Sequence, residues 1–216
     1  MKRREFSRLA AGLALLAPGV GVPTAWAQER FEEGVDFLPL ETRAPTEAAA
    51  GRIEVVEFFW YSCPHCNAFE PQLAQWVRQL PKSVQFRRVP VAFQDSFVPQ
   101  QRLYYTLEAL GAVERLHAKV FAAIHGERRN LARPDAIADW AVEQGLDRTQ
   151  FNAYFNSFGV TSKARRATQL QEAYQVQGVP AMGVAGRYYT DGTVAKSMDR
   201  VLRVVEALVS GIRNGR

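Results

Sequence analysis

The two cysteines of the chain are its residues with the clearest chemical potential, and they lie three positions apart in the run Cys63-Pro64-His65-Cys66. No further cysteine is present to form a separate bridge. The pair is therefore a redox couple, a fragment of a metal site or a local covalent link. Because a thiol reacts as its thiolate, and a free cysteine has a pKa of about 8.5, the surroundings of the pair decide which role it can take.

The pair lies at the predicted junction of a strand and a helix. Residues 53–59 are mostly β-branched and aromatic, as in a buried strand, and a helical pattern follows. Ser62 is a suitable cap for this helix, and Pro64 suits its first turn. The backbone N–H groups and the dipole at a helix start favour an anionic sulfur at Cys63. Cys66 falls on the same helical face, close enough to Cys63 for a disulfide ring.

His65, between the cysteines, is a second candidate for stabilising the thiolate. An imidazolium, or an imidazole N–H donor, near the Cys63 sulfur favours its charged form. A stabilised thiolate favours the reduced protein, and about 30 mV of reduction potential corresponds to about 1.4 kcal/mol. The motif therefore favours donating disulfides over removing them. The alternative is that His65 is a solvated residue at a helix start with no effect.

The period of the hydropathy pattern predicts the other elements. The expected order is a short strand at 34–38, the strand at 53–59, a helix to residue 80, a strand at 84–89, several helices within 97–176, an extended segment at 178–184, a hairpin at 188–192 with its turn at Asp191-Gly192, and a closing helix at 201–212. The strands at 53–59 and 84–89 form a βαβ unit and should pair in parallel. The fold class is therefore α/β, interrupted by a helical block.

The N-terminus is typical of an export signal. Cations at 2–4 precede an apolar stretch at 9–22 and the small-x-small site Ala25-Trp26-Ala27, after which we predict cleavage. The apolar stretch is shorter than the ~20 residues that a spanning helix needs. Arg3-Arg4 also resembles a twin-arginine signal, so the Sec and twin-arginine routes both stay open. The mature chain should lie outside the cytoplasm, where a disulfide can persist.

Composition limits the function classes. The 216 residues are 47% apolar and 23% charged, which is typical of a globular protein and excludes a disordered or collagenous one. The net charge is +5, but four cations and one acid of that balance lie in the first 27 residues. The charge of the remainder is too small to indicate a nucleic-acid surface. We expect no nucleic-acid partner.

The run from Val56 to Cys66, followed much later by Gly178-Val179-Pro180-Ala181-Met182, resembles the DsbA family of the thioredoxin superfamily. The resemblance implies a thioredoxin-like domain, a mixed sheet flanked by helices, at residues 28–96 and 177–216. An all-helical insertion at 97–176 should interrupt it. It also implies a periplasmic thiol:disulfide oxidoreductase that donates a Cys63–Cys66 disulfide to newly exported proteins. Cys63 would be the nucleophile and Cys66 the resolving residue, with no cofactor beyond this redox-active disulfide.

The resemblance assigns roles to residues outside the dithiol. It implies a cis peptide at Val179–Pro180, facing the dithiol, where the backbone of Val179 pairs with an extended substrate chain. Pro71 resembles the proline that kinks the corresponding helix in thioredoxins. Trp60 and Tyr61 form either an apolar rim for unfolded chains or part of the core, and the same choice applies to Met182.

Glu57 is an acid in an otherwise apolar strand. Strand alternation places it on the same face as Val55 and Phe59, so its carboxylate should be partly desolvated beneath the dithiol. The resemblance implies proton transfer to or from Cys66, with Arg88 as the basic partner. The alternative is a structural ion pair of Glu57 with Arg87 or Arg88.

Three other functions compete with this hypothesis. A metal site would need more ligands than the motif supplies, and His117 and His125, eight residues apart on one helix, would be about 12 Å apart along its axis. A disulfide isomerase or reductase is the second alternative, but isomerases of this superfamily add a dimerisation domain, and only residues 28–52 precede the second strand. The third alternative is a peptide-binding module in which the two cysteines form an unreactive link, but such a module would have no reason to expose Cys63 at a helix start. We therefore expect a monomer. The family resemblance implies that it is reoxidised by the quinone-linked inner-membrane oxidase DsbB.

Overall fold

The computed structural model describes residues 29–215, and the compact unit considered below begins at Phe31. The predicted signal peptide and its cleavage after Ala27 lie outside the described residues. Among the residues that are described, no helix is long and apolar enough to cross a membrane.

Five strands of the described chain form one mixed sheet in the order β1-β5-β4-β2-β3. Their bounds are Leu38–Pro39 (β1), Ile53–Phe59 (β2), Val84–Pro90 (β3), Ala181–Val184 (β4) and Tyr188–Asp191 (β5). The predicted parallel pairing of β2 with β3 is confirmed, while β4 pairs antiparallel with β2 and β5. Every residue of β2 is buried because helices cover both faces of the sheet around it.

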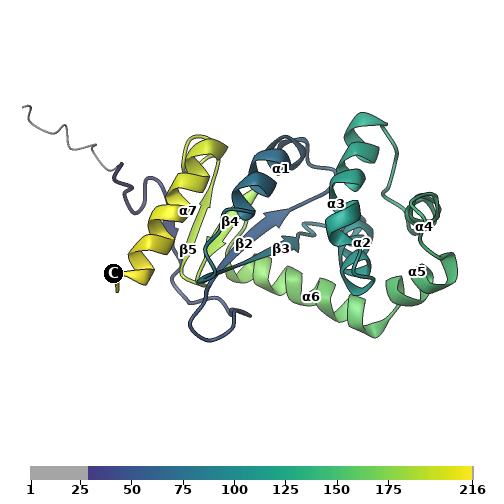
Figure 1. Cartoon of the computed structure of the whole chain (residues 1–216), viewed down its shortest axis with the longest axis horizontal. Coiled ribbons are helices and arrows are strands. Elements are labelled where there is room, and N and C mark those ends of the chain that lie inside the picture. The colour runs from purple at the N-terminus through teal and green to yellow at the C-terminus, as the bar shows by residue number, and fades with distance from the viewer. Residues whose placement is uncertain (1–28, 216) are drawn as a thin grey trace, which may run out of the picture. The chain divides into compact units, whose positions relative to one another are not determined.

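Helices α1 (Pro64–Val77) and α7 (Met198–Arg213) cover one face of the sheet, and α6 (Phe158–Ala173) covers the other (Figure 1). The first face packs residues such as Val55, Leu73 and Met182 into one apolar cluster. Met182 is fully buried there and is therefore a core residue. The second face packs Val56 and Phe58 against side chains from α6.

The predicted helical block between β3 and β4 is confirmed. It contains η1 (Asp95–Phe97), α2 (Val98–Ala109), α3 (Val113–Phe121), the π-helical turn η2 (Ala122–Gly126), α4 (Pro134–Glu143), α5 (Arg148–Phe155) and α6. One apolar cluster runs from Phe58 in the sheet to Leu107, Trp140 and Phe151 in this block. The expected division into domains at 97 and 176 stays a prediction.

The expected strand at 34–38 is wrong in its position. The chain turns there, with the N–H of Gly34 donating to Phe37 O at 2.8 Å, and β1 begins only at Leu38. Asp36 is held in this turn by Arg200, whose Nη2 lies 2.8 Å from its carboxylate. Residues 34–37 are therefore fixed by hydrogen bonds and an ion pair, and of the expected strand only Leu38 pairs with β5.

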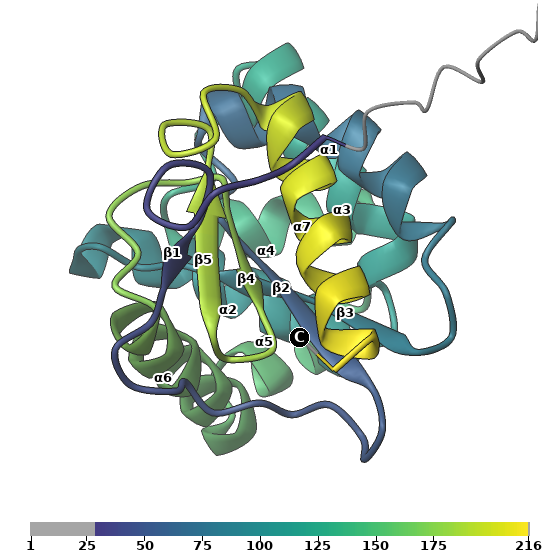
Figure 2. The ribbon, with the colours of Figure 1, turned by 90° about the vertical axis from the view of Figure 1, so that its left-hand side faces the viewer.

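The predicted hairpin is present, but its turn at Asp191-Gly192 is wrong. The chain reverses at Ala185 and Gly186, whose φ angles are 54° and 66°, between β4 and β5 (Figure 2). Asp191 ends β5, and its Oδ1 accepts from the N–H groups of Thr193 and Val194 at 2.8 Å. An Asp-Gly pair can thus begin a loop as well as close a hairpin.

Candidate functional site

Cys63 is itself the N-cap of α1, so the prediction of Ser62 as the cap is wrong. Its backbone is extended, and its Sγ accepts from the backbone N–H of Cys66 at 3.3 Å. The N–H of Cys63 donates to Trp60 O at 3.0 Å and closes a turn just before the helix. A sulfur therefore occupies the place where a capping oxygen usually satisfies the free N–H groups of a helix start.

The two cysteines have opposite acidities. The pKa of Cys63 is lowered to about 6, first by a hydrogen bond from the Cys66 side chain, and then by the backbone N–H groups of Cys66 and His65 and by the charge of His65, against the effect of burial. Burial raises the pKa of the Cys66 thiol far above its usual range, and the neighbouring Cys63 and Glu57 add to this. Cys63 is therefore the thiolate of the pair at neutral pH.

Both cysteines are free thiols in this structure. The Cys63–Cys66 disulfide of the oxidised form therefore stays a prediction. His65 is exposed beside Cys63, at the mouth of the site. Its backbone N–H and its charge both lower the pKa of Cys63, which supports the predicted effect on the thiolate.

The Val179–Pro180 peptide lies against the dithiol and is cis, as the resemblance implied. The thiol of Cys63 donates to Val179 O at 3.3 Å. A groove opens beside this contact, lined by His65, Gly178, Val179, Pro180, Asp191, Gly192, Thr193, Ser197 and Met198. The site thus brings together the helix start and a backbone segment more than a hundred residues later in the chain.

Glu57 lies on the inner side of the dithiol and is 1% exposed. Its Oε2 lies 3.1 Å from Arg88 Nε, the partner predicted for it, and the two residues are opposite each other in the β2–β3 register. Burial raises the pKa of Glu57 to about 8, although Arg88 opposes this. Arg87 turns to the other face and pairs with Glu54 at 3.2 Å. Proton transfer through Glu57 stays a prediction.

Sequence reasoning missed a buried polar chain behind this pair. Arg88 Nη2 donates to both carboxylate oxygens of Glu70, at 2.8 and 3.0 Å, and Glu70 Oε2 lies 3.4 Å from His117 Nε2. His117 Nδ1 is 2.9 Å from the hydroxyl of Tyr61. One signal was available for Glu70: it follows Cys66 by four residues, on the helical stripe that faces the core. His117 carries no such signal because its contacts depend on the tertiary fold.

In this buried polar chain, the protonation state of each residue is set by the opposing effects of burial and of neighbouring charged groups. Burial acts to raise the pKa of Glu70, but the contacts with His117 and Arg88 hold it below its ordinary value. Burial lowers the pKa of His117, partly opposed by Glu70, so the ring is neutral near pH 7. Burial also acts against the charge of Arg88, but Glu57 and Glu70 raise its pKa further. The inner side of the site therefore holds one cation between one carboxylate and one carboxylic acid.

The structure separates Tyr61 from Trp60, the two residues considered for an apolar rim. Tyr61 is 1% exposed and belongs to the core, so the rim hypothesis is wrong for it. Trp60 is half-buried and stacks on Phe97, with ring centroids 3.7 Å apart and planes 4° from parallel. For Trp60 the rim stays a prediction.

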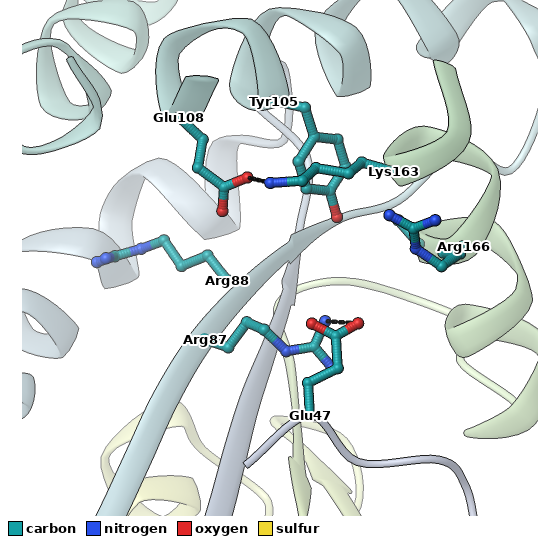
Figure 3. A pocket seen from close by; sticks show the side chains of 8 residues that line it. Glu47, Arg87, Arg88, Tyr105, Glu108, Lys163 and Arg166 are labelled. Atoms are coloured by element: carbon teal, nitrogen blue, oxygen red, sulfur yellow. Dashed lines mark hydrogen bonds and ion pairs between the residues drawn. The ribbon is translucent and has the colours of Figure 1, made fainter. Parts of the chain in front are cut away.

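A second pocket, between β3, α2 and α6, shares only Arg88 with the dithiol site (Figure 3). Its other labelled residues are Glu47, Arg87, Tyr105, Glu108, Lys163 and Arg166, and the Arg88 guanidinium points away from them. Lys163 pairs with Glu108 at 2.5 Å and Arg87 with Glu47 at 3.6 Å. The pocket is a solvated face of ion pairs.

No group of three His, Cys, Asp or Glu side chains within residues 29–215 is arranged to hold a metal ion. His117 and His125, weighed as ligands, contact different atoms of Tyr61 instead: its hydroxyl and its carbonyl oxygen.

Known proteins are similar to this chain both in sequence and in structure. Residues 84–206 match the model of the DSBA-like thioredoxin domain family. The chain is 37% identical over 206 residues to a thiol:disulfide interchange protein DsbA of Burkholderia cepacia, covering 95% of this chain and 92% of that protein. It is 36% identical to the protein of that name from Azotobacter vinelandii, over the whole length of both. The crystal structure of Pseudomonas aeruginosa DsbA superposes with a TM-score of 0.81 at 37% identity, covering 86% of this chain and 96% of that one.

Proposed function

Because the chain belongs to the DSBA-like thioredoxin domain family, we propose that it is a disulfide oxidase, which donates its Cys63–Cys66 disulfide to pairs of thiols in newly exported proteins. The observation that carries the proposal is the opposite acidity of the two cysteines. A dithiol whose outer sulfur is stable as a thiolate favours its reduced form, and its disulfide is therefore a strong oxidant.

In the first step, a thiolate of the substrate attacks the Cys63 sulfur of the oxidised protein. The Cys63–Cys66 bond breaks, its electron pair goes to Cys66, and a mixed disulfide forms between Cys63 and the substrate. The buried Cys66 sulfur must take up a proton because its environment disfavours a charge. Glu57, buried beside it with a pKa of about 8, is the proposed source of that proton.

In the second step, another thiolate of the substrate attacks the substrate sulfur of the mixed disulfide. The new disulfide forms within the substrate, and Cys63 leaves as the thiolate that the start of α1 stabilises. A thiol of low pKa is a better leaving group, so the low pKa of Cys63 speeds release. The substrate loses two electrons and two protons. The enzyme dithiol gains both electrons and takes up one proton at Cys66, while Cys63 stays a thiolate and the other proton passes to the solvent.

Substrate chains dock along the backbone at Val179. The carbonyl of this residue already contacts the Cys63 sulfur, so an extended chain that pairs with it would place its own sulfur beside Cys63. The neighbouring groove offers apolar and polar side chains without a fixed pattern, which suits a protein that accepts many sequences.

The proposed setting follows from the predicted export signal. The protein acts in the periplasm as a monomer, needs no cofactor beyond its cysteine pair, and is reoxidised by the quinone-linked inner-membrane oxidase DsbB. Exported proteins with free thiols are its substrates. The related proteins named for thiol:disulfide interchange support this assignment.

The experiment that tests the function is an equilibrium of Cys63–Cys66 with a glutathione redox buffer, followed by the fluorescence of the adjacent Trp60. We expect a reduction potential well above about −180 mV, as for a dedicated oxidant. A value near −270 mV, like that of thioredoxin, would identify a reductant and contradict the proposal, and a value near −180 mV would favour an isomerase.

A further inference from the structure

The three residues before Cys63 are held by the helical block and not by the sheet alone. Trp60 stacks on Phe97, the Tyr61 carbonyl contacts His125, and Ser62 contacts Gln100. All three partners come from the segment inserted between β3 and β4. The turn at residues 60–62, which positions the Cys63 sulfur, is therefore held by the helical block, which contains none of the reacting groups.

Gln100, on α2, makes the most complete of these contacts. It is 2% exposed, and its Oε1 accepts from the N–H of Ser62 at 3.2 Å. Its Nε2 donates to Ser62 Oγ at 2.7 Å and to Leu131 O at 3.1 Å. Both N–H donors and the oxygen of the amide are thus used, so the side chain has one orientation.

His125, in η2, makes an independent contact with the same turn. Its Nε2 lies 2.8 Å from the carbonyl oxygen of Tyr61, and because that oxygen can only accept, Nε2 carries the proton. The ring also lies against Phe121, with centroids 6.1 Å apart and planes at 28°. Gln100 and His125 thus hold the N–H and the carbonyl oxygen of the same peptide group, which joins Tyr61 to Ser62 directly before Cys63.

We propose that Gln100 and His125 are positioning residues for thiol–disulfide exchange, which hold the backbone of Tyr61 and Ser62 so that the Cys63 sulfur keeps its contacts with the start of α1 and with Val179. The inference rests on the proposed function in taking Cys63 as the exchanging sulfur. The contact that supports the thiolate, from the N–H of Cys66 to the Cys63 sulfur, is 3.3 Å long, and hydrogen bonds weaken steeply with misalignment. A small movement of the turn therefore weakens the support of the thiolate.

The neighbouring residue Gln101 supplies a matched control. It is also 2% exposed on α2, and its Nε2 donates to Pro90 O at 2.9 Å and to Thr168 Oγ1 at 3.2 Å. Neither of these two hydrogen bonds reaches residues 60–63. Gln100→Met and Gln101→Met each remove buried amide hydrogen bonds at similar side-chain volume, so both should destabilise the fold.

The test compares the two variants by the ultraviolet absorbance of the Cys63 thiolate against pH and by the glutathione equilibrium. For Gln100→Met we expect a higher pKa of Cys63 and a shift of about tenfold in the equilibrium toward the disulfide, the effect of losing one to two net hydrogen bonds. For Gln101→Met we expect lower thermal stability and an unchanged pKa. Equal pKa values in both variants and the unmodified protein would overturn the proposal.

A second variant, at His125, tests the proposed positioning role if Gln100→Met does not fold. His125→Leu removes the contact with Tyr61 O from a half-buried position, and it should also raise the pKa of Cys63. An unchanged pKa there would count against the proposal. The oxidase function and the positioning role can be refuted separately. A thioredoxin-like reduction potential of the unmodified protein would refute the oxidase function. The difference in the pKa of Cys63 between Gln100→Met and Gln101→Met would still decide the positioning role.

Discussion

The outer and inner sulfurs of the dithiol lie at the same helix start but have opposite acidities. On the outer side, Cys63 is in contact with backbone N–H groups and lies beside the exposed His65, and its pKa is low. On the inner side, Cys66 and Glu57 are fully buried, and both are driven toward their protonated forms. Two sulfurs three residues apart thus differ in acidity because one caps the helix and the other lies beneath it. This difference gives the exchange its direction.

The largest effect should come from removing each sulfur in turn. Cys63→Ser should abolish disulfide donation, because no sulfur remains for the substrate to attack. Cys66→Ala should stop turnover, because the Cys63–Cys66 disulfide that substrates attack can no longer form. With glutathione disulfide as the oxidant and a protein substrate that carries a single thiol, Cys63 should accumulate in mixed disulfides, which non-reducing gel electrophoresis would detect. Normal turnover by Cys66→Ala would mean that the inner sulfur is not the resolving one.

A smaller effect should come from the inner acid, and it depends on pH. Folded Glu57 keeps its proton up to about pH 8, whereas its ordinary pKa is 4.5. The folded state therefore binds more protons between these values, and this group makes stability fall as pH rises. Glu57→Gln should remove that slope and add roughly 2 to 3 kcal/mol near pH 7 relative to pH 4.5.

Urea unfolding across this pH range would measure the effect, with Cys63→Ser and Cys66→Ser in both proteins so that no thiol titrates. Glu54→Gln is a suitable control, because Glu54 is buried to the same 1% in the same strand but pairs with Arg87. Parallel pH profiles for Glu57→Gln and its parent would show that Glu57 is ionised in the fold.

The smallest effect should come from the exposed edge. His65 acts on Cys63 through its backbone N–H and its charge, and the side chain is solvated, so only the charge is lost in His65→Ser. We expect a higher pKa of Cys63 and a change of roughly tenfold or less in the glutathione equilibrium. An unchanged thiolate titration would restrict the stabilisation to the backbone groups and to Cys66.

Local signals in the sequence predicted the outer side of the site well. The dithiol, the strand before it and the helix after it are each encoded in a few consecutive residues. On the inner side, Glu57 was identifiable as an acid in an apolar strand, but the choice between Arg87 and Arg88 as its partner depends on the strand register that the structure shows. The errors here were small ones of local chemistry: a cysteine caps α1 in place of Ser62, and an Asp-Gly pair begins a loop instead of closing a hairpin.

The inner side was less predictable because its partners come from distant segments. Glu70, His117 and Gln100 gain their roles only when the helical block packs against the sheet, and no periodic pattern marks a buried polar contact between two elements. Tyr61 was ambiguous for the same reason, since an aromatic residue beside a motif is equally suited to a rim and to a core. Its hydroxyl contact with His117 decides for the core.

The contact between Cys63 and Val179 also has a consequence for the order in which the protein is made. The two residues are 116 positions apart, and β4 completes the sheet only after the whole helical block has been synthesised. At about 5–20 residues per second, that interval lasts roughly 6 to 23 seconds. During this time each nascent chain carries its cysteine pair without the segment proposed to receive substrates, so the site is completed among the last steps of the protein's own biogenesis.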